Sequence, residues 1–351
     1  MSAVSGFFGY VRLRPGRYRE RHGLALEEFA PGQVFAHRPG VDFAQQDNAE
    51  EALDTLNNAQ LHYDTHYAAA TEWQRPLGVS TLTLQRLLGM SSRTFYRRRR
   101  FLGFDEIAMV RPVYGGDTLY ARTRVASVEE GDADAGILSL VTEGENQRGE
   151  TVARILYRAE IYRRGHHPED AGLGDIAEEE RFHLYHPGAD GALVEQSGLY
   201  FEEFAEGEIF EHWPGKTISA AESRRHALRS LELNPRYADP AYARSLLGRE
   251  PDLFEPFVLG AVTALTTRTF GRVAANLGWK EVLLPRPVDP DETIRAISTI
   301  LAKRESASRP NEGILSVDTV ALGADDTPVC AFKRTLLVYK RGLGPYVPAG
   351  Y

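Results

Sequence analysis

The chain has 351 residues, of which 42% are hydrophobic and 26% are charged, a composition typical of globular proteins. Its formal net charge is −8, so the whole chain lacks the positive charge expected of a nucleic-acid-binding protein. No apolar run approaches the roughly 20 residues that a membrane-spanning helix needs. The length predicts two domains, each large enough to bury its own core.

The single cysteine, Cys330, excludes an internal disulfide and suits a reducing cytoplasm, which is the predicted location. It lies in CAFKRTLLVYKR, a segment that predicts a strand, so we interpret it as a packed hydrophobic residue rather than a nucleophile. The first residues contain a short apolar stretch followed by arginines, which is the reverse of a signal peptide.

The sequence repeats itself at one constant offset, as three pairs of segments show. PGQVFAHRPG at 31–40 returns as EGEIFEHWPG at 206–215. SSRTF at 91–95 returns as TTRTF at 266–270, and DEIAMVRPVYGGDTL at 105–119 returns as KEVLLPRPVDPDETI at 280–294. A constant offset predicts two copies of one fold unit, in which each residue can be compared with its counterpart.

The repeat also predicts the domain boundaries. Residues 1–25 are expected to form an N-terminal extension without a counterpart in the second copy. We expect the remaining segments to be a first domain at 26–165, an acidic linker at 166–197, a second domain at 198–342 and a tail at 343–351.

Each copy predicts the same order of elements. A short strand (VFAHRPG or IFEHWPG) is followed by a polar helix at 47–59 or 222–233. A second helix begins at Asp64 or Asp239, because Asp is a good N-cap. Long alternating segments follow and predict antiparallel hairpins, which together indicate an α+β fold. We expect the two sheets to join edge to edge in a pseudo-dimer, because joining removes exposed strand edges.

This order of motifs resembles the MaoC-like hydratases, whose hotdog fold is a long helix wrapped by a curved antiparallel sheet. In that family a D-x-N-P-L-H-x-D segment precedes the central helix, and NNAQLHYD at 57–64 is similar to it. The turn PVYGGDTL at 112–119 and the segment AANLG at 274–278 also resemble the family. The doubled chain is most similar to bacterial double-hotdog acyl-CoA hydratases, such as the mesaconyl-CoA hydratase (β-methylmalyl-CoA dehydratase) group.

The resemblance implies an enoyl-CoA hydratase or 3-hydroxyacyl-CoA dehydratase, a hydro-lyase that needs no cofactor beyond the coenzyme A of its substrate. It makes His62 the acid/base residue, and the ordinary pKa of histidine near neutrality suits that role. The family has an Asp five residues earlier, where this chain has Asn57. An amide cannot take up a proton, but it can hold a water molecule or a histidine tautomer. Asp54 and Asp47 are alternative carboxylates.

The second copy has Glu232 and Tyr237 at the two positions of the expected catalytic pair. This difference predicts that the second copy keeps the shape of the pocket without its chemistry. We therefore expect one active site at the junction of the copies, with His62 in it, because ligand sites favour such interfaces.

The resemblance also suggests residues that bind the substrate. Gly78 or Ser80 is expected to face the thioester oxygen, and the sequence does not choose between them. A run of arginines special to the first copy either forms a solvated edge or binds the phosphates of coenzyme A. These residues are Arg97, Arg98, Arg99 and Arg100. No metal site is expected, because a helix start at Asp64 separates His62 from His66.

Two other functions remain open. A hotdog thioesterase would need a carboxylate that activates water, for which Glu232 or Asp47 are the candidates. A non-catalytic member that binds acyl thioesters is favoured by the missing Asp. The expected partner is an acyl-CoA, with neither nucleic acid nor membrane, and the pseudo-dimer can itself pair into a homodimer.

Overall fold

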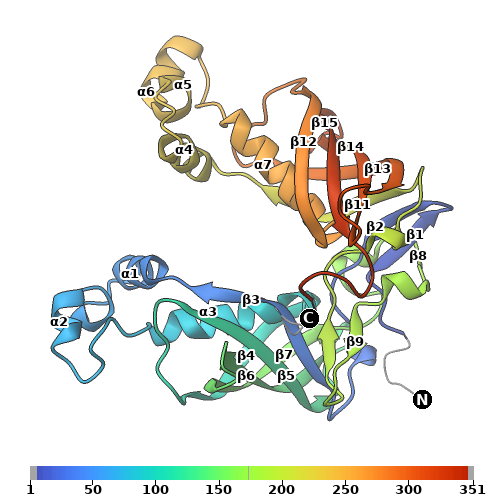
Figure 1. Cartoon of the computed structure of the whole chain (residues 1–351). Helices are drawn as coiled ribbons and strands as arrows, with labels where there is room; N and C mark the ends of the chain where they lie inside the picture. Colours follow the sequence, from blue (N-terminus) through green and yellow to red (C-terminus); the bar gives the residue numbers. More distant parts are fainter. Residues whose placement is uncertain (1–5, 173, 347–351) are drawn as a thin grey trace.

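The structure is a computed structural model that describes residues 6–172 and 174–346. The chain forms two lobes that diverge from a shared junction (Figure 1). The first lobe consists of β3 (Val34–Phe43), α1 (Gln45–Asp54), α2 (Thr65–Ala69), α3 (Ser80–Met90), β4 (Arg98–Met109), β5 (Asp117–Glu129), β6 (Ala135–Asn146) and β7 (Thr151–Tyr162).

The second lobe repeats this order. Its elements are β11 (Ile209–Thr217), α4 (Ala220–Arg229), α5 (Pro235–Ala238), α6 (Pro240–Tyr242), α7 (Glu255–Leu265), β12 (Val273–Leu283), β13 (Thr293–Glu305), β14 (Glu312–Leu322) and β15 (Pro328–Tyr339). The central helix begins at Ser80 in one lobe and at its counterpart Glu255 in the other, so the offset of the sequence repeat holds in three dimensions.

A central helix packs on a curved antiparallel sheet in each lobe. The helix α3 buries Leu82, Thr83, Leu87 and Leu88, of which Thr83 and Leu87, four residues apart, share one face. The sheet presents alternating residues to it, and the burial pattern of β5 follows the two-residue period of a half-buried strand. Burying each large apolar side chain contributes about 1.5–3 kcal/mol. The predicted α+β fold of tandem hotdog-like lobes is therefore confirmed.

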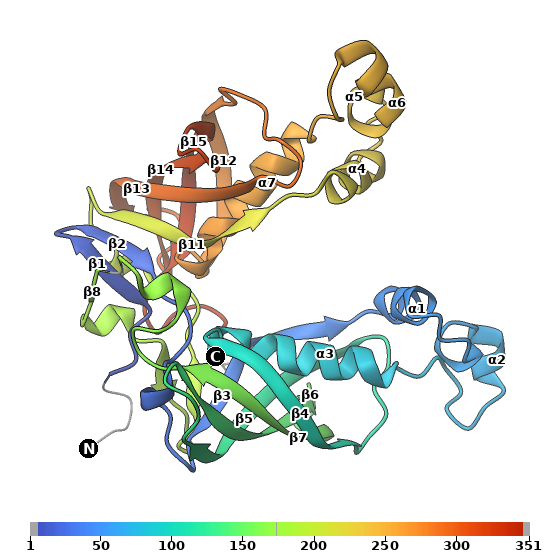
Figure 2. The same cartoon turned by 180° about the vertical axis from the view of Figure 1, so that it is seen from behind.

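The central helix starts later in the chain than the sequence predicts. Asp64 does cap a helix, since it accepts a hydrogen bond from the Tyr67 amide at 2.9 Å, but that helix ends at Ala69. The chain then turns through Gln74, which has a φ of 58°, and the central helix α3 begins only at Ser80. The segments that contain α1 and α2, and α4 to α6, instead form arms at the far ends of the lobes (Figures 1 and 2).

The two lobes exchange strands at their junction. The N-terminal hairpin of β1 (Tyr10–Arg14) and β2 (Arg17–Glu20) joins the sheet of the second lobe, where β2 runs parallel to β11. The later strands β9 (Tyr185–Pro187) and β10 (Leu193–Glu195) join the sheet of the first lobe, where β10 runs parallel to β3. Tyr10 and Tyr185, like Glu20 and Glu195, are counterparts at the offset of the repeat.

The exchange corrects two predictions. Within the segment 1–25, the described residues 10–20 do have a counterpart, because the hairpin of β1 and β2 corresponds to β9 and β10. The sheets do not join edge to edge: the described strands form one sheet in the order β4-β7-β6-β5-β3-β10-β9 and another in the order β12-β15-β14-β13-β11-β2-β1-β8, in which β8 is Asp175–Ile176. The physical reason is that the exchanged strands already cover the edges of β3 and β11.

The domain boundaries stay predictions. The segment 166–197, expected as a linker, contributes β8, β9 and β10 to the two sheets. Part of the predicted extension (1–5) and most of the predicted tail (347–351) lie outside the described residues. Among the described helices, none combines the length and the apolar character that crossing a membrane requires.

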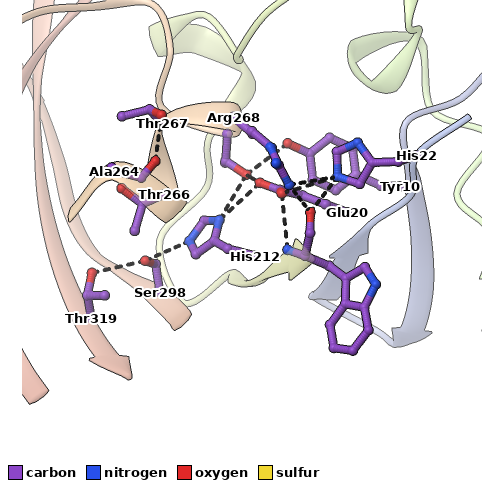
Figure 3. Close-up of polar contacts among 12 residues, drawn as sticks. Tyr10, Glu20, His22, His212, Ala264, Thr266, Thr267, Arg268, Ser298 and Thr319 are labelled. Carbon is purple, nitrogen blue, oxygen red and sulfur yellow. Dashed lines mark hydrogen bonds and ion pairs between the residues drawn. The ribbon is translucent and has the colours of Figure 1, made fainter. Parts of the chain in front are cut away.

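Each exchanged hairpin carries a buried glutamate that binds a histidine of the other copy. Glu195 lies 2.9 Å from Nδ1 of His37, and Nε2 of His37 lies 2.8 Å from the Thr123 hydroxyl. The second lobe repeats this contact with Glu20 at 3.0 Å from Nδ1 of His212 (Figure 3). Because all four of these Glu and His side chains are buried, each pair joins one copy to the other by a charged contact that water cannot reach.

Candidate functional site

His62 lies in the arm of the first lobe, in the short helix η2 (Gln60–His62) between α1 and α2. Its Nδ1 is 2.8 Å from the carbonyl oxygen of Leu77, and the ring is half-buried. A carbonyl only accepts hydrogen bonds, so Nδ1 carries the proton in the neutral ring. Nε2 therefore keeps its lone pair, which is the state that a general base needs.

Asn48 holds this part of the arm together, and the sequence analysis missed it. Its buried side chain donates to the carbonyls of His62 and Leu77, both at 3.0 Å, and accepts from the Val79 amide at 2.7 Å. The counterpart of Asn48 is Ser223, whose hydroxyl accepts from the Phe254 amide at 2.7 Å. The sequence feature that could have identified Asn48 is a polar residue on the buried face of a helix in both copies.

A cavity of about 270 Å³ opens next to Leu77, the residue that fixes the His62 ring. Gly78 and Ser80 both line it. His62 is not one of its lining residues and is linked to it through the Leu77 carbonyl. The Gly78 amide donates to the Val113 carbonyl at 2.8 Å, and a Cβ at this glycine would meet the same oxygen at 2.8 Å. Gly78 is thus explained by close packing, whereas Ser80 begins α3, where backbone amides lack intrahelical partners.

Asn57 and the alternative carboxylates lie apart from the His62 ring. The Asn57 side chain accepts a hydrogen bond from the Ala59 amide at 3.0 Å, which closes the turn that leads to His62. Asp47 forms a salt bridge with Arg86 at 2.5 Å, and Asp54 is exposed at the end of α1. None of the three forms a hydrogen bond or an ion pair with His62 within the described residues. The catalytic role of Asn57 stays a prediction.

The arginine run is largely engaged in ion pairs. Arg97, Arg99 and Arg100 form salt bridges with Asp170, Asp132 and Glu160, at 2.6, 2.6 and 2.8 Å. The guanidinium of Arg98 lies over the Phe101 ring, 3.9 Å from its centre. These partners favour a structural role, and the predicted binding of phosphates by this run stays a prediction.

The second lobe has an equivalent cavity of about 350 Å³ with different residues. Tyr237 stands for His62, and Glu255 and Leu253 stand for Ser80 and Gly78. The Tyr237 hydroxyl donates to Glu255 at 2.6 Å. Burial and this carboxylate raise the pKa of Tyr237 to about 12.

The sequence analysis paired Tyr237 with the wrong carboxylate. Glu232 instead accepts from the Asn234 amide at 2.8 Å, and Glu255 is the partner of Tyr237. Because Glu255 is the counterpart of Ser80 at the offset of the repeat, the repeat itself could have identified it.

The junction of the lobes also holds a cavity, of about 630 Å³, but His62 does not line it. The expectation of a junction site that contains His62 is therefore wrong for this chain, because the arms point away from the junction (Figure 2). Among the described residues no cluster of three or more His, Cys, Asp or Glu side chains is arranged to hold a metal ion. Asp64 does separate His62 from His66 as the cap of α2.

Solved structures similar to this chain include a putative MaoC domain protein dehydratase from Chloroflexus aurantiacus. It is 21% identical, and the alignment covers 91% of this chain and 98% of that chain with a TM-score of 0.40. A Mycobacterium tuberculosis protein described as a double hotdog fold is 20% identical, over 93% of this chain and 100% of that chain, with a TM-score of 0.37. Since both TM-scores are low, the fold stands on the strands and helices described above.

Curated relatives cover less of the chain. The mesaconyl-CoA hydratase of Haloarcula marismortui is 27% identical over 159 residues, which are 43% of this chain and 43% of that protein. That of Cereibacter sphaeroides is 29% identical over 161 residues, or 44% and 45%. The alignments thus span less than half of the length of these relatives. The sequence model of mesaconyl-CoA hydratase, however, matches residues 16–182 and again residues 175–344. With both halves matched, the chain belongs to the mesaconyl-CoA hydratase family.

Proposed function

We propose that this protein adds water to a 2-enoyl thioester of coenzyme A, or removes it in the reverse direction, at the cavity beside Leu77 in the first lobe, with His62 as the base. The observation that carries the proposal is the 2.8 Å contact of His62 Nδ1 with the carbonyl of Leu77, a residue that lines the cavity, because this contact keeps Nε2 available as a base. The family match supports mesaconyl-CoA as the substrate.

The proposed reaction uses His62 twice. Nε2 takes a proton from water while the water oxygen bonds to Cβ, and the double-bond electrons move to Cα and the thioester oxygen. The imidazolium then returns the proton to Cα, so the hydroxyacyl thioester forms and the ring is neutral again. The first-turn amides of α3, beginning at Ser80, are the proposed donors to the enolate oxygen. This reaction needs no cofactor beyond the coenzyme A of the substrate.

The test is to incubate the protein with a panel of enoyl-CoA thioesters, mesaconyl-CoA included. Hydration removes the conjugated enoyl absorbance while coenzyme A stays attached. His62→Ala should lower the turnover number by about 10²–10⁴-fold, the usual range for a general acid–base group. His66→Ala is the matched control, because His66 lies four residues away and is exposed. Unchanged turnover in a folded His62→Ala protein removes this residue from the mechanism.

A thioesterase is the second candidate, and one observation favours it. Glu255 is a carboxylate at the start of a helix that lines the second cavity, where a base for hydrolytic water would be needed. The same panel distinguishes this activity, because hydrolysis releases a free thiol. A protein that neither hydrates nor hydrolyses but still binds the thioesters would be the non-catalytic member.

We also propose that two copies of the chain associate through their open sheet edges. β4 and β12 are terminal strands of the two sheets. Exposed apolar residues gather on them and directly after them: Phe101, Phe104, Ile107, Met109, Val110, Leu277, Trp279, Val282, Leu283 and Leu284. Long apolar edges are templates for pairing with another strand. Light scattering should give twice the chain mass, and Phe104→Glu with Trp279→Glu should give the single chain. A monomeric wild type contradicts this proposal.

The proposed location is the cytoplasm. It rests on Cys330, which is buried as a free thiol whose pKa burial raises to about 11. An unreactive single cysteine suits a reducing compartment.

A further inference from the structure

The cavity at the junction is lined by residues of both copies, some of which are counterparts of one another. Three pairs of its lining residues are counterparts at the offset of the repeat: Pro39 with Pro214, Arg93 with Arg268, and His22 with Ser197. The rest of its wall comes from β3, α3 and the turn after α3 in the first lobe. A ligand in this cavity would therefore touch both lobes.

The wall of this cavity is positively charged. Arg38, Arg86, Arg93 and Arg268 line it, and none of the described lining residues is Asp or Glu. Arg86 is paired with Asp47. The whole chain carries a net charge of −8, so this local excess of cations opposes the general sign of the protein. Several guanidinium groups around one space repel each other and attract an anion.

Arg93 and Arg268 keep hydrogen-bonding capacity for a ligand. Arg93 donates to the Gln196 carbonyl, and Arg268 donates to the Trp213 carbonyl at 2.5 Å. Neither forms a salt bridge with a carboxylate among residues 6–172 and 174–346. The Nε atom of Arg93 is buried and has no hydrogen-bond partner within the same residues. Carbonyls position the two guanidinium groups, and the buried carboxylate of Glu195, whose pKa the charge of Arg93 helps to lower, faces Arg93 without a direct ion pair.

A buried carboxylate, Glu20, lies close to Arg268 and His22 but is already engaged (Figure 3). Its oxygens accept from His212, Thr269 and the Trp213 amide, at 3.0, 2.7 and 3.2 Å. Burial lowers the pKa of His22 and outweighs the raising effect of Glu20, and the charges of Arg268 and Arg93 lower it further. His22 therefore adds a neutral polar group to the cavity at neutral pH.

The size and the remaining wall suit an organic ligand. Pockets of about 300–1,000 Å³ hold small molecules, and the volume of about 630 Å³ falls in this range. Val41, Leu82 and Met90 provide an apolar surface, and the Tyr96 ring is held by a 2.7 Å hydrogen bond from its hydroxyl to Glu169. Guanidinium groups bind phosphate oxygens in pairs, and a fixed aromatic ring can pack against a base.

We propose that this junction cavity binds the phosphate-bearing nucleotide end of coenzyme A, with Arg93 and Arg268 as paired phosphate ligands, one from each copy. Coenzyme A as the source of the phosphate rests on the proposed acyl-CoA function, whereas the anion site itself does not. Because the ligand contacts both lobes, its binding also stabilises their relative position.

Titration calorimetry of the full chain with adenosine 3′,5′-bisphosphate tests the proposal. Arg93→Ala and Arg268→Ala should each weaken binding by about 10–100-fold, the effect of losing one charged hydrogen-bonding group. Arg124→Ala is the matched control, since Arg124 is an exposed arginine on β5. Circular dichroism confirms that each variant is folded, and Arg93→Lys tests the same position with the charge retained and the fork removed. It should recover only part of the affinity.

Three other outcomes would each overturn a different part of the proposal. If inorganic phosphate binds as tightly as the bisphosphate, the anion site stands and its assignment to a nucleotide is overturned. Binding of mesaconate without binding of the bisphosphate overturns the phosphate assignment. Equal affinity in wild type, Arg93→Ala and Arg268→Ala overturns the site. His62→Ala should bind the bisphosphate as wild type does, so a failure of the hydratase proposal is distinguishable from a failure of this one.

Discussion

The junction and the arms differ in how far the two copies of the duplicated sequence have kept the same residues. At the junction the two copies keep the same residues: His37 and His212, Glu195 and Glu20, Arg93 and Arg268. In the arms and at the start of the central helices the counterparts differ in chemistry: His62 and Tyr237, Ser80 and Glu255, Gly78 and Leu253.

The difference has a structural cause. Each copy donates a hairpin to the sheet of the other lobe. Each of the two buried Glu–His pairs therefore helps to hold the two lobes together. Loss of one carboxylate would leave its buried partner without a match, which is costly. The arms meet through an exposed ion pair between Arg229 of α4 and Glu50 of α1 at 3.9 Å, a weak contact, so residues of an arm can change with little effect on the other copy.

Breaking a junction pair should have the largest effect on stability. Glu20→Ala removes the carboxylate that binds His212 and should lower the free energy of unfolding by about 3–5 kcal/mol. Urea unfolding followed by circular dichroism measures this change. Glu250→Ala is the control, because Glu250 forms an exposed salt bridge with Arg244 that contributes about 0–1 kcal/mol. Equal losses in the two variants would contradict the role of the junction pair.

Acid should weaken the same junction. Burial opposes ionisation of Glu20 and Glu195, but contacts with histidines outweigh it and hold the pKa of both carboxyls below the ordinary value. A carboxyl with a lowered pKa in the folded state stabilises the fold above its unfolded pKa, about 4.3. That contribution is lost as pH falls through the folded pKa. The free energy of unfolding should therefore decrease below about pH 5, and less steeply in Glu20→Ala.

The repeat predicted the order of elements, the cap at Asp64 and the equivalence of the copies, because each depends on local sequence. It did not predict the exchange of strands. The exchanged hairpins are short and share few identical residues, among them Tyr10 with Tyr185 and Glu20 with Glu195. Which sheet a short strand joins depends on contacts distant in the sequence, and the local pattern does not contain them.

The candidate site was predicted only in part, for a similar reason. His62, Gly78 and Ser80 were identified through the family resemblance, and the structure places all three around Leu77. Asn48 was missed because a buried amide looks like an ordinary polar residue of a surface helix until its partners are known. The position of the arm, away from the junction, depends on the strand exchange and was not predictable from motifs.

A smaller effect, on turnover, is expected from substitutions at Asn57 in the turn before His62. Asn57→Ala should lower turnover by about 10²-fold, the effect of removing one positioned donor. Asn57→Asp should retain activity, because the two side chains have nearly the same shape and both can accept from the Ala59 amide. Steady-state kinetics measure this, with the exposed neighbour variant Asn58→Ala as the control. If the wild type is inactive and Asn57→Asp alone becomes active, Asn57 is a relic of a lost catalytic Asp.

The smallest effect is expected in the second arm, at the counterpart of His62. Because the pKa of Tyr237 is about 12, its hydroxyl stays protonated at neutral pH and donates to Glu255. It cannot act as a base there, so Tyr237→Phe should change the hydration rate by less than about two-fold. The lost hydrogen bond should cost about 1 kcal/mol of stability. A fall in turnover comparable to that of His62→Ala would mean that both arms are catalytic. The duplication would then have preserved two different active sites in one chain.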